Sequence, residues 1–207
     1  MWRNYFKITW RNLAKDRQFS LLNLAGLSTG IACVILIYLW IADERSIDRF
    51  NEKDSQLFQV IKTSLNVDGT IETHETTPGL LAQAMVQAIP EVEYAVPVST
   101  EPAGLLSADE KYIKARPQFA GRDFLNVFSY KLIDGNKNKA LSDKHGVILS
   151  DKLALKLFNT TSGLVGKTLI WDGIDEMDGP YTISGIIKGP PANASAQFDI
   201  VFSYDLY

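Results

Sequence analysis

The segment most similar to a reactive site is TSGLVGKT, from Thr161 to Thr168. It matches the end of a phosphate-binding Walker A loop, whose backbone amides and lysine hold nucleotide phosphates, but Thr161 stands where the motif requires glycine. The context also differs, because a Walker loop follows a strand and opens a helix, whereas here a helical pattern precedes and a strand pattern follows. We therefore expect no nucleotide or other cofactor site.

Metal and nucleophile chemistry lack the residue spacing that they need. His74 and His145 are the only histidines, and neither has a second histidine or a cysteine at ligand spacing. The acidic segment DGIDEMDG (172–179) breaks the ligand alternation of an EF-hand at Ile174, so a solvated hairpin tip is the better interpretation. No G-x-S-x-G nucleophile elbow occurs. The sequence thus predicts a protein that is not an enzyme, with no catalytic residue and no metal ligand.

A long uncharged segment, FSLLNLAGLSTGIACVILIYLWIA, runs from Phe19 to Ala42. As a helix it would extend roughly 36 Å, enough to cross a hydrocarbon core of about 30 Å. A signal-peptide core is shorter, about 7 to 15 residues, and the bulky Trp40 two positions before Ala42 suits a cleavage site poorly. We expect a retained transmembrane helix over residues 19–42.

Charge is distributed unevenly on the two sides of this segment. The first eighteen residues hold five basic residues and one acidic residue, a net charge of +4. The remaining 16 basic and 23 acidic residues give the rest of the chain −7. Because basic flanks stay in the cytoplasm, we expect the N-terminus inside and residues 43–207 outside. An acidic outer domain is also unsuited to nucleic acid.

Residues 1–18 have a helical pattern of their own. Aromatic side chains recur at helical spacing beside a basic row formed by Arg3, Lys7, Arg11 and Lys15. Such a pattern is typical of a helix in the headgroup layer, with its aromatic side on membrane lipid. The alternative is the charged leader of an ordinary membrane protein; three aromatic residues on one stripe favour the amphipathic helix.

Small and polar residues share one face of the expected membrane helix: Asn23, Gly26, Gly30 and Cys33. Gly26 and Gly30 form a GxxxG pair, which lets two helix backbones approach closely, and a buried Asn23 amide needs a partner. GxxxG also arises by chance in apolar helices, so the residues alone leave open whether this face packs on another membrane helix. Cys33, the single cysteine, is expected to pack and not to serve redox chemistry.

Residues 43–207 have the length of one ordinary domain or two small lobes. DERSIDRFN, directly after the apolar segment, is expected to continue the membrane helix and to place Ile47 and Phe50 on one side as a coupling segment. If so, a tilt of the helix would reach the outer domain as the motion of a lever.

The rest of the outer region predicts an α+β fold with antiparallel hairpins. LFQVIKTSLNVDGTIETHETT predicts two strands around a DG turn, and TTPGLLAQAMVQAIPEV predicts a helix with Thr77 as its N-cap. Short strands and helices then alternate, including the helix DKLALKLF, which Ser150 is expected to cap.

The segment from Asn4 to Asn51, NYFKITWRNLAKDRQFSLLNLAGLSTGIACVILIYLWIADERSIDRFN, carries a family resemblance. They are similar to the N-terminus of FtsX/MacB-like ABC transporter permeases, especially the large form of Bacteroidota. Further similar segments follow in order: TPGLLAQAM, PEVEYAV, FLNVFSYKLIDGN, GVILSDKLALKLF, GKTL and YTISGIIKGPPANASAQFD. The resemblance covers almost the whole chain, and it departs at RSIDRF and in a shortened stretch between PEVEYAV and FAGRDF.

The resemblance implies a permease subunit in the inner membrane, multi-pass in its full length, with a cytoplasmic amphipathic helix (1–18), a transmembrane helix (19–42) and a MacB-like periplasmic core domain (43–207). The implied partners are a cytoplasmic ABC ATPase, a second permease half in a homodimer or pseudo-dimer, membrane lipid and a periplasmic protein. ATP hydrolysis by the ATPase would drive extracytoplasmic conformational change, for export or mechanotransmission. The resemblance also favours packing of the Gly26 and Gly30 face. The alternative function is a single-pass, membrane-anchored periplasmic binding or sensor module.

The charge asymmetry generates a topology prediction. Alkaline phosphatase fused after Gly135 should be active, and fused after Lys15 it should be inactive, because its disulfides form only outside the cytoplasm. Activity after Lys15 combined with silence after Gly135 would reverse the assignment.

Overall fold

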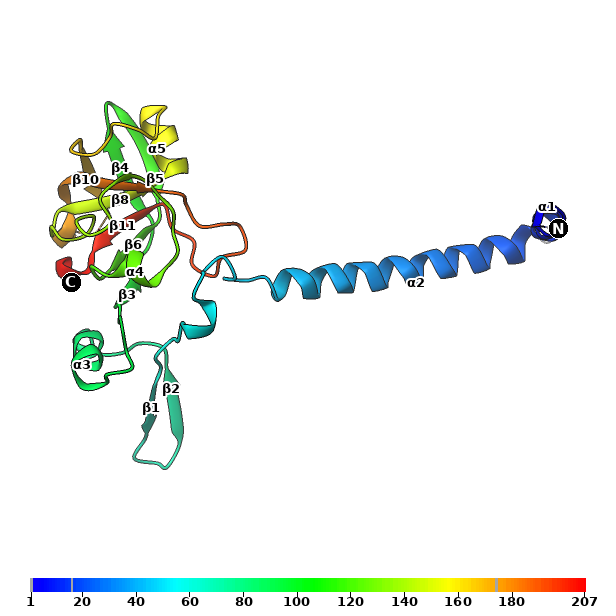
Figure 1. The fold of residues 1–207 in the computed structure, drawn as a ribbon, viewed down its shortest axis with the longest axis horizontal. Coiled ribbons are helices and arrows are strands. Elements are labelled where there is room, and N and C mark those ends of the chain that lie inside the picture. Colours follow the sequence, from blue (N-terminus) through cyan, green and yellow to red (C-terminus); the bar gives the residue numbers. More distant parts are fainter. Residues whose placement is uncertain (1, 16, 174) are drawn as a thin grey trace. The chain divides into compact units, whose positions relative to one another are not determined.

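The computed structural model describes residues 2–15, 17–173 and 175–207, and the chain divides into two compact units between Ile47 and Asp48. The first unit consists of two helices, α1 (Trp2–Lys15) and α2 (Arg17–Glu44) (Figure 1). The helix expected over residues 1–18 is confirmed at Trp2–Lys15, while Met1 and Asp16 lie outside the described residues. Its placement in the headgroup layer stays a prediction.

Among the described helices, α2 alone is long and apolar enough to cross a membrane, and none of its apolar window is buried. Its hydroxyl groups need partners within the helix, since hydrocarbon offers none. Thr29 meets this need by donating a hydrogen bond to the Ala25 carbonyl, 2.8 Å away. The Thr29 hydroxyl is therefore satisfied within the helix even in apolar surroundings.

The expected continuation of this helix to Phe50 is wrong, because α2 ends at Glu44. The amide of Ser46 donates to the Asp43 carbonyl at 2.9 Å, and its hydroxyl donates to the same carbonyl at 2.7 Å. This three-residue spacing tightens the last turn, and the side-chain bond competes with the helical pattern. Asp48 then has a φ of 57°, in the left-handed region, which ends helical geometry.

The second unit, Asp48–Tyr207, is an α+β domain, as the sequence predicted. Its strands are β1 (Lys62–Leu65), β2 (Ile71–His74), β3 (Val98–Thr100), β4 (Gly104–Ala108), β5 (Lys111–Ala115), β6 (Pro117–Ala120), β7 (Leu132–Gly135), β8 (Gly146–Ser150), β9 (Thr168–Asp172), β10 (Gly179–Ile187) and β11 (Ile200–Ser203). Its helices are α3 (Leu81–Ala88), α4 (Phe124–Val127) and α5 (Asp151–Phe158), with short 3₁₀ turns η1 (Asp54–Gln56), η2 (Asp175–Met177) and η3 (Tyr204–Leu206).

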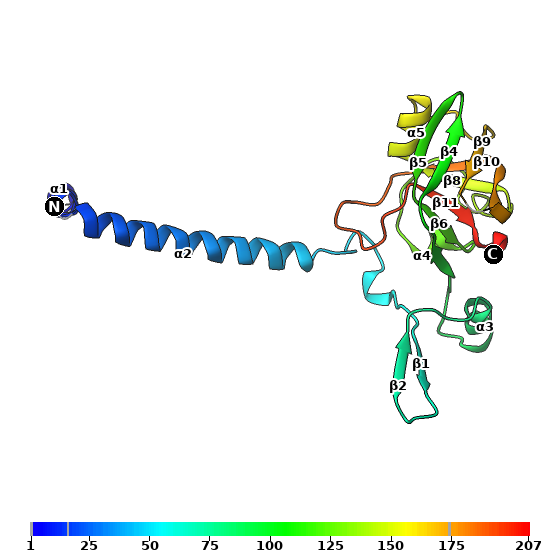
Figure 2. The same cartoon turned by 180° about the vertical axis from the view of Figure 1, so that it is seen from behind.

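Nine of these strands form one mixed sheet in the order β3-β6-β11-β8-β10-β9-β4-β5, with β7 paired to β10 as well. The pairs β10–β8 and β11–β6 are parallel, and the other pairs are antiparallel. β1 and β2 form a separate two-stranded sheet. Figures 1 and 2 show this hairpin as a ribbon that projects from the larger sheet.

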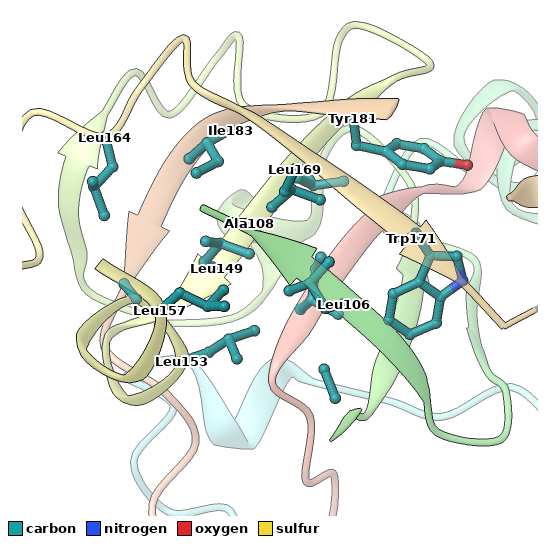
Figure 3. Close-up of a cluster of buried hydrophobic side chains, with 14 of the residues drawn as sticks. Leu106, Ala108, Leu149, Leu153, Leu157, Leu164, Leu169, Trp171, Tyr181 and Ile183 are labelled. Carbon is teal, nitrogen blue, oxygen red and sulfur yellow. The ribbon is translucent and has the colours of Figure 1, made fainter. Parts of the chain in front are cut away.

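Apolar residues on both faces of the nine-stranded sheet are buried, because side chains alternate along each strand. On one face, α5 contributes Leu153 and Leu157 to a cluster with Leu149, Ile183 and Trp171 (Figure 3). The opposite face forms a second cluster around α4, with these buried residues: Ala120, Phe124, Leu125, Ile148, Ile187, Phe198 and Val201. The sheet is thus the core of the domain.

Local sequence explains most element boundaries. Ser150 caps α5 as expected, since its hydroxyl accepts the Leu153 amide at 3.2 Å. The expected hairpin is confirmed as well, with Gly69 at a φ of 84° in the turn. Thr77 as an N-cap is wrong: a turn from Pro78 to Leu81, closed by a 3.0 Å amide-to-carbonyl bond, delays the start of α3.

The packing of Trp171 yields a stability prediction. A Cβ atom on Gly104 would overlap the indole ring, so Gly104→Ala should lower the free energy of unfolding by about 1–3 kcal/mol through overpacking. Because Trp171→Phe shrinks the ring, the double variant should lose less than the sum of the two single losses. Urea unfolding followed by circular dichroism measures this, and additive losses would contradict the contact.

Candidate functional site

The segment that follows α2 is fixed to the domain by an arrangement that we call the N-terminal clamp. It consists of Asp48, Phe50 and Asn51 with their partners Ser129, Tyr130 and Ser195. Asp48 occupies the left-handed backbone region, which aspartate and asparagine tolerate better than most residues. Its carboxylate oxygen Oδ1 accepts the amide of Ser195 at 3.0 Å. The first residue of the domain therefore has a partner 147 residues further along the chain.

Asn51 is the centre of the clamp. It is only 5% exposed, and its side-chain Nδ2 donates to the Asp48 carbonyl at 3.1 Å. Its Oδ1 accepts the Ser129 amide at 3.1 Å, and Ser129 returns a bond by accepting the Glu52 amide on Oγ at 2.9 Å. This buried side chain thus joins a carbonyl in its own turn to an amide 78 residues further along the chain, and its removal is costly.

Aromatic packing adds to these hydrogen bonds. The ring of Phe50 lies 5.3 Å from that of Tyr130, whose ring also contacts Phe124 at 5.4 Å and Phe198 at 5.3 Å. Burial raises the pKa of the Tyr130 hydroxyl well above its ordinary value, and the negative charge of Asp48 raises it further. Phe50 is therefore part of the aromatic cluster on the α4 face of the sheet.

The structure separates the two residues of the expected coupling segment. Phe50 packs within the domain, as described, whereas Ile47 belongs to the N-terminal unit and keeps 38% of its surface exposed. The helical turn that was expected to hold both on one side is absent at 45–50, which the structure describes fully. Their role in coupling stays a prediction.

The membrane-face residues Asn23, Gly26, Gly30 and Cys33 all lie on α2, and all are exposed. At both glycines an added Cβ would meet nothing within 4 Å, so this face is open to close approach by another helix. Packing of this face stays a prediction.

Asp48 and Asn51 were missed from the sequence. They lie within DERSIDRFN, whose charge pattern fits an exposed helix, and their partners at Ser129 and Ser195 are far along the chain. The sequence did offer one local signal, which is that Asp and Asn are unfavourable in the interior of a helix. Both residues tolerate the left-handed backbone region and form hydrogen bonds to nearby backbone groups.

The TSGLVGKT loop has the context that the sequence predicted, after α5 and before β9. Its amides are already bonded within the protein: Gly163 donates to the Asp134 carboxylate at 2.9 Å, and Gly166 donates to the Ile183 carbonyl at 2.8 Å. The Lys167 ammonium lies 5.2 Å from the centre of the Phe158 ring. A carboxylate beside the loop is unfavourable for phosphate.

Within the described residues, no three His, Cys, Asp or Glu side chains gather at metal-binding distance. His74 lies 3.6 Å from the Glu72 carboxylate, and His145 packs on the ring of Tyr181 at 5.8 Å. The acidic segment 172–179 is a hairpin tip between β9 and β10, as expected, although Ile174 lies outside the described residues.

Comparison with known proteins identifies a family. The family model described as MacB-like periplasmic core domain matches residues 20–207. A search of curated proteins finds no significant match.

Several solved structures are similar. One is a domain of a candidate permease protein from Porphyromonas gingivalis, 27% identical over 61% of this chain and 57% of that chain, with a TM-score of 0.54. The extracellular domain of the ABC-type transporter YknZ from Gram-positive bacteria is 20% identical over 59% and 60% of the two chains, with a TM-score of 0.45. The periplasmic region of MacB from Actinobacillus actinomycetemcomitans is 16% identical over 60% and 56%, with a TM-score of 0.42. Each match spans less than two thirds of the neighbour's own length.

The clamp generates a second stability prediction. Asn51→Ala leaves the partly buried Ser129 amide without its acceptor and should lower the free energy of unfolding by about 1–3 kcal/mol. The measurement is urea unfolding of residues 45–207, followed by tryptophan fluorescence. Trp171 is the single tryptophan of that segment.

Asn126→Ala is the matched control, because the side-chain amide of Asn126 donates to the Asp123 carboxylate in its own turn. An equal loss in both variants would show that the bonds of Asn51 to distant segments add nothing.

Proposed function

Because the chain belongs to the family of proteins with a MacB-like periplasmic core domain, we propose that it is part of an ABC transporter permease of the MacB/FtsX type. In this proposal, a cytoplasmic partner ATPase hydrolyses ATP, and the permease converts the resulting motion into conformational change of the outer domain. The chain itself contributes no catalytic residue. The change would serve export or mechanotransmission.

The N-terminal clamp is the observation that carries this proposal. Only the three residues Arg45 to Ile47 separate the end of α2 from Asp48, so displacement of the helix pulls directly on the clamp. A free linker would absorb such displacement by changing its backbone angles. At Asp48 and Asn51, by contrast, displacement must break partly buried hydrogen bonds or move the segments attached to them.

The segments attached to the clamp lead to the centre of the sheet. Ser129 lies three residues before β7, and Ser195 lies in the connection from β10 to β11. β7 pairs with β10, and the Lys188 amide after β10 donates to the Lys131 carbonyl at 2.8 Å. Motion at the clamp can therefore reach β10 through the segment 129–131 and the hydrogen bonds between β7 and β10. β10 pairs with three strands, more than any other strand of this sheet.

Placement in the membrane follows from the same proposal. Residues before α2 are cytoplasmic, the domain is periplasmic, and the full-length protein crosses the inner membrane several times. The open glycine face of α2, with Gly26 and Gly30, would pack on a membrane helix of the same or a paired permease half. The basic row of α1 would lie on anionic lipid headgroups.

The proposal predicts that a damaged clamp uncouples the transporter. In the intact permease reconstituted with its ATPase, Phe50→Ala with Asn51→Ala should leave ATP hydrolysis within about twofold of the unmodified rate, because the ATPase contacts lie elsewhere. The ATP-driven change in amide exchange at β7 and residues 188–199 should fall by about fivefold or more, as expected when a coupling of about 1–3 kcal/mol is lost.

Phe58→Ala with Asn138→Ala is the matched control, since both residues are exposed and lie outside the clamp. An undiminished ATP-driven change in the clamp variant would refute the route through Asp48 and Asn51. Absence of any ATP-dependent change in the unmodified protein would favour the anchored sensor module instead.

A further inference from the structure

One part of the outer domain differs from the rest in both packing and charge. We call residues 52–97 the hairpin lobe; it contains η1, the β1–β2 hairpin and α3. The structure describes every residue of this lobe, and none is buried. Its seven acidic and two basic residues give it a net charge of −5, whereas residues 98–207 carry only −1. The acidity of the outer region is therefore concentrated in the lobe.

The lobe also exposes large apolar side chains. In the hairpin, Leu65 and Ile71 form a cross-strand pair and are 74% and 73% exposed. Thr63 and Thr73 form the next pair on the same face, because facing residues alternate along the strands. Exposed apolar side chains grouped on one face and bordered by polar residues are typical of a surface that binds another protein.

The same four residues direct their backbone amides and carbonyls away from the partner strand of the hairpin. The Asn66 amide donates to the Thr70 carbonyl at 2.9 Å, which fixes the alternation of hydrogen-bonded pairs in the hairpin. By that alternation, the amides and carbonyls of Thr63 and Leu65 point outward on the β1 edge, and those of Ile71 and Thr73 point outward on the β2 edge. Each edge can accept a further strand.

Charge distinguishes the two edges. β2 carries Glu72, and Glu75 follows it directly, whereas β1 carries Lys62. A basic strand is therefore attracted more strongly to the β2 edge than to the β1 edge, where Lys62 lies. A second copy of the lobe would be repelled, because each copy carries a net charge of −5. Anionic lipid would be repelled for the same reason.

From this geometry we infer that the outer edge of β2 accepts a strand from an extracytoplasmic protein partner with alternating basic and aliphatic residues. The aliphatic side chains of that strand lie beside Ile71 and Thr73, and the basic side chains lie beside Glu72 on the other face. The assignment goes beyond the proposed permease function and rests on it only for the position of the domain outside the cytoplasm; it does not depend on the N-terminal clamp. Its test is the binding of a strand at the outer edge of β2.

The probe is an eight-residue peptide of alternating lysine and valine, blocked at both ends, with a glutamate–valine peptide as its control. The protein is the full chain in phosphatidylcholine nanodiscs, labelled for NMR. The lysine peptide should bind, and it should slow amide exchange at Ile71 and Thr73 but not at Thr63 and Leu65. Raising salt from about 0.05 to 0.5 M should weaken binding by about tenfold or more, since the attraction is electrostatic.

Two pairs of variants complete the test. Thr73→Pro removes an outward amide and should weaken binding by about tenfold, whereas Thr63→Pro on the other edge should change it less than about twofold. Glu72→Lys with Glu75→Lys should also cost about tenfold. The same charge change at another hairpin tip, Asp109→Lys with Glu110→Lys, should have little effect. The charge variants keep the test decisive if proline unfolds the hairpin.

Three outcomes would overturn the inference. The first is equal binding of the glutamate and lysine peptides, and the second is equal loss in the Thr63→Pro and Thr73→Pro variants. The third is protection of the Ile71 and Thr73 amides by self-association of the chain without any peptide, which would assign the edge to a second copy.

Discussion

The Asn51 side chain supplies the contact on which the start of the Asp48–Tyr207 domain depends. A chain that leaves an apolar helix must enter a folded domain with its backbone groups satisfied, since buried unpaired groups cost about 1–3 kcal/mol each. Asn51 meets this constraint by donating to the Asp48 carbonyl and accepting from the Ser129 amide. These bonds fix where the domain begins, and they make the first residues after the helix part of the packed structure.

This start of the domain is continuous with the α4 face of the sheet. Phe50 packs on Tyr130, which contacts Phe124 and Phe198 in turn. The opposite face, with α5 and Trp171, is closed by a separate apolar cluster. The hairpin lobe has no buried residue at all, and the structure describes it fully. The domain thus divides into a packed, nearly neutral sheet region and an exposed, acidic lobe.

Features encoded by neighbouring residues could be predicted from the sequence. The apolar helix, the DG hairpin and the Ser150 cap each rest on contacts within a few residues, and all three are present. The clamp could not be predicted, because Asp48 and Asn51 find their partners 78 to 147 residues away. The end of α2 depends on local bonds from Ser46 to the Asp43 carbonyl, which the charge pattern of DERSIDRFN does not reveal. Thr77 was misassigned because the turn from Pro78 to Leu81 displaced the start of α3. The order of strands in the sheet likewise depends on distant pairs, such as β11 with β6.

Amide hydrogen exchange at Ser129 is the most direct test of the central claim that the clamp is part of the core. The Ser129 amide donates to Asn51 Oδ1, and the Asn138 amide donates to Asn136 Oδ1 in an exposed loop, so the two bonds match in type but not in burial. If the clamp is as stable as the sheet, Ser129 should exchange about a hundredfold more slowly than Asn138, close to the amides of β8. Equal exchange at Ser129 and Asn138 would show that the segment after α2 is a loose tether, and would contradict the account.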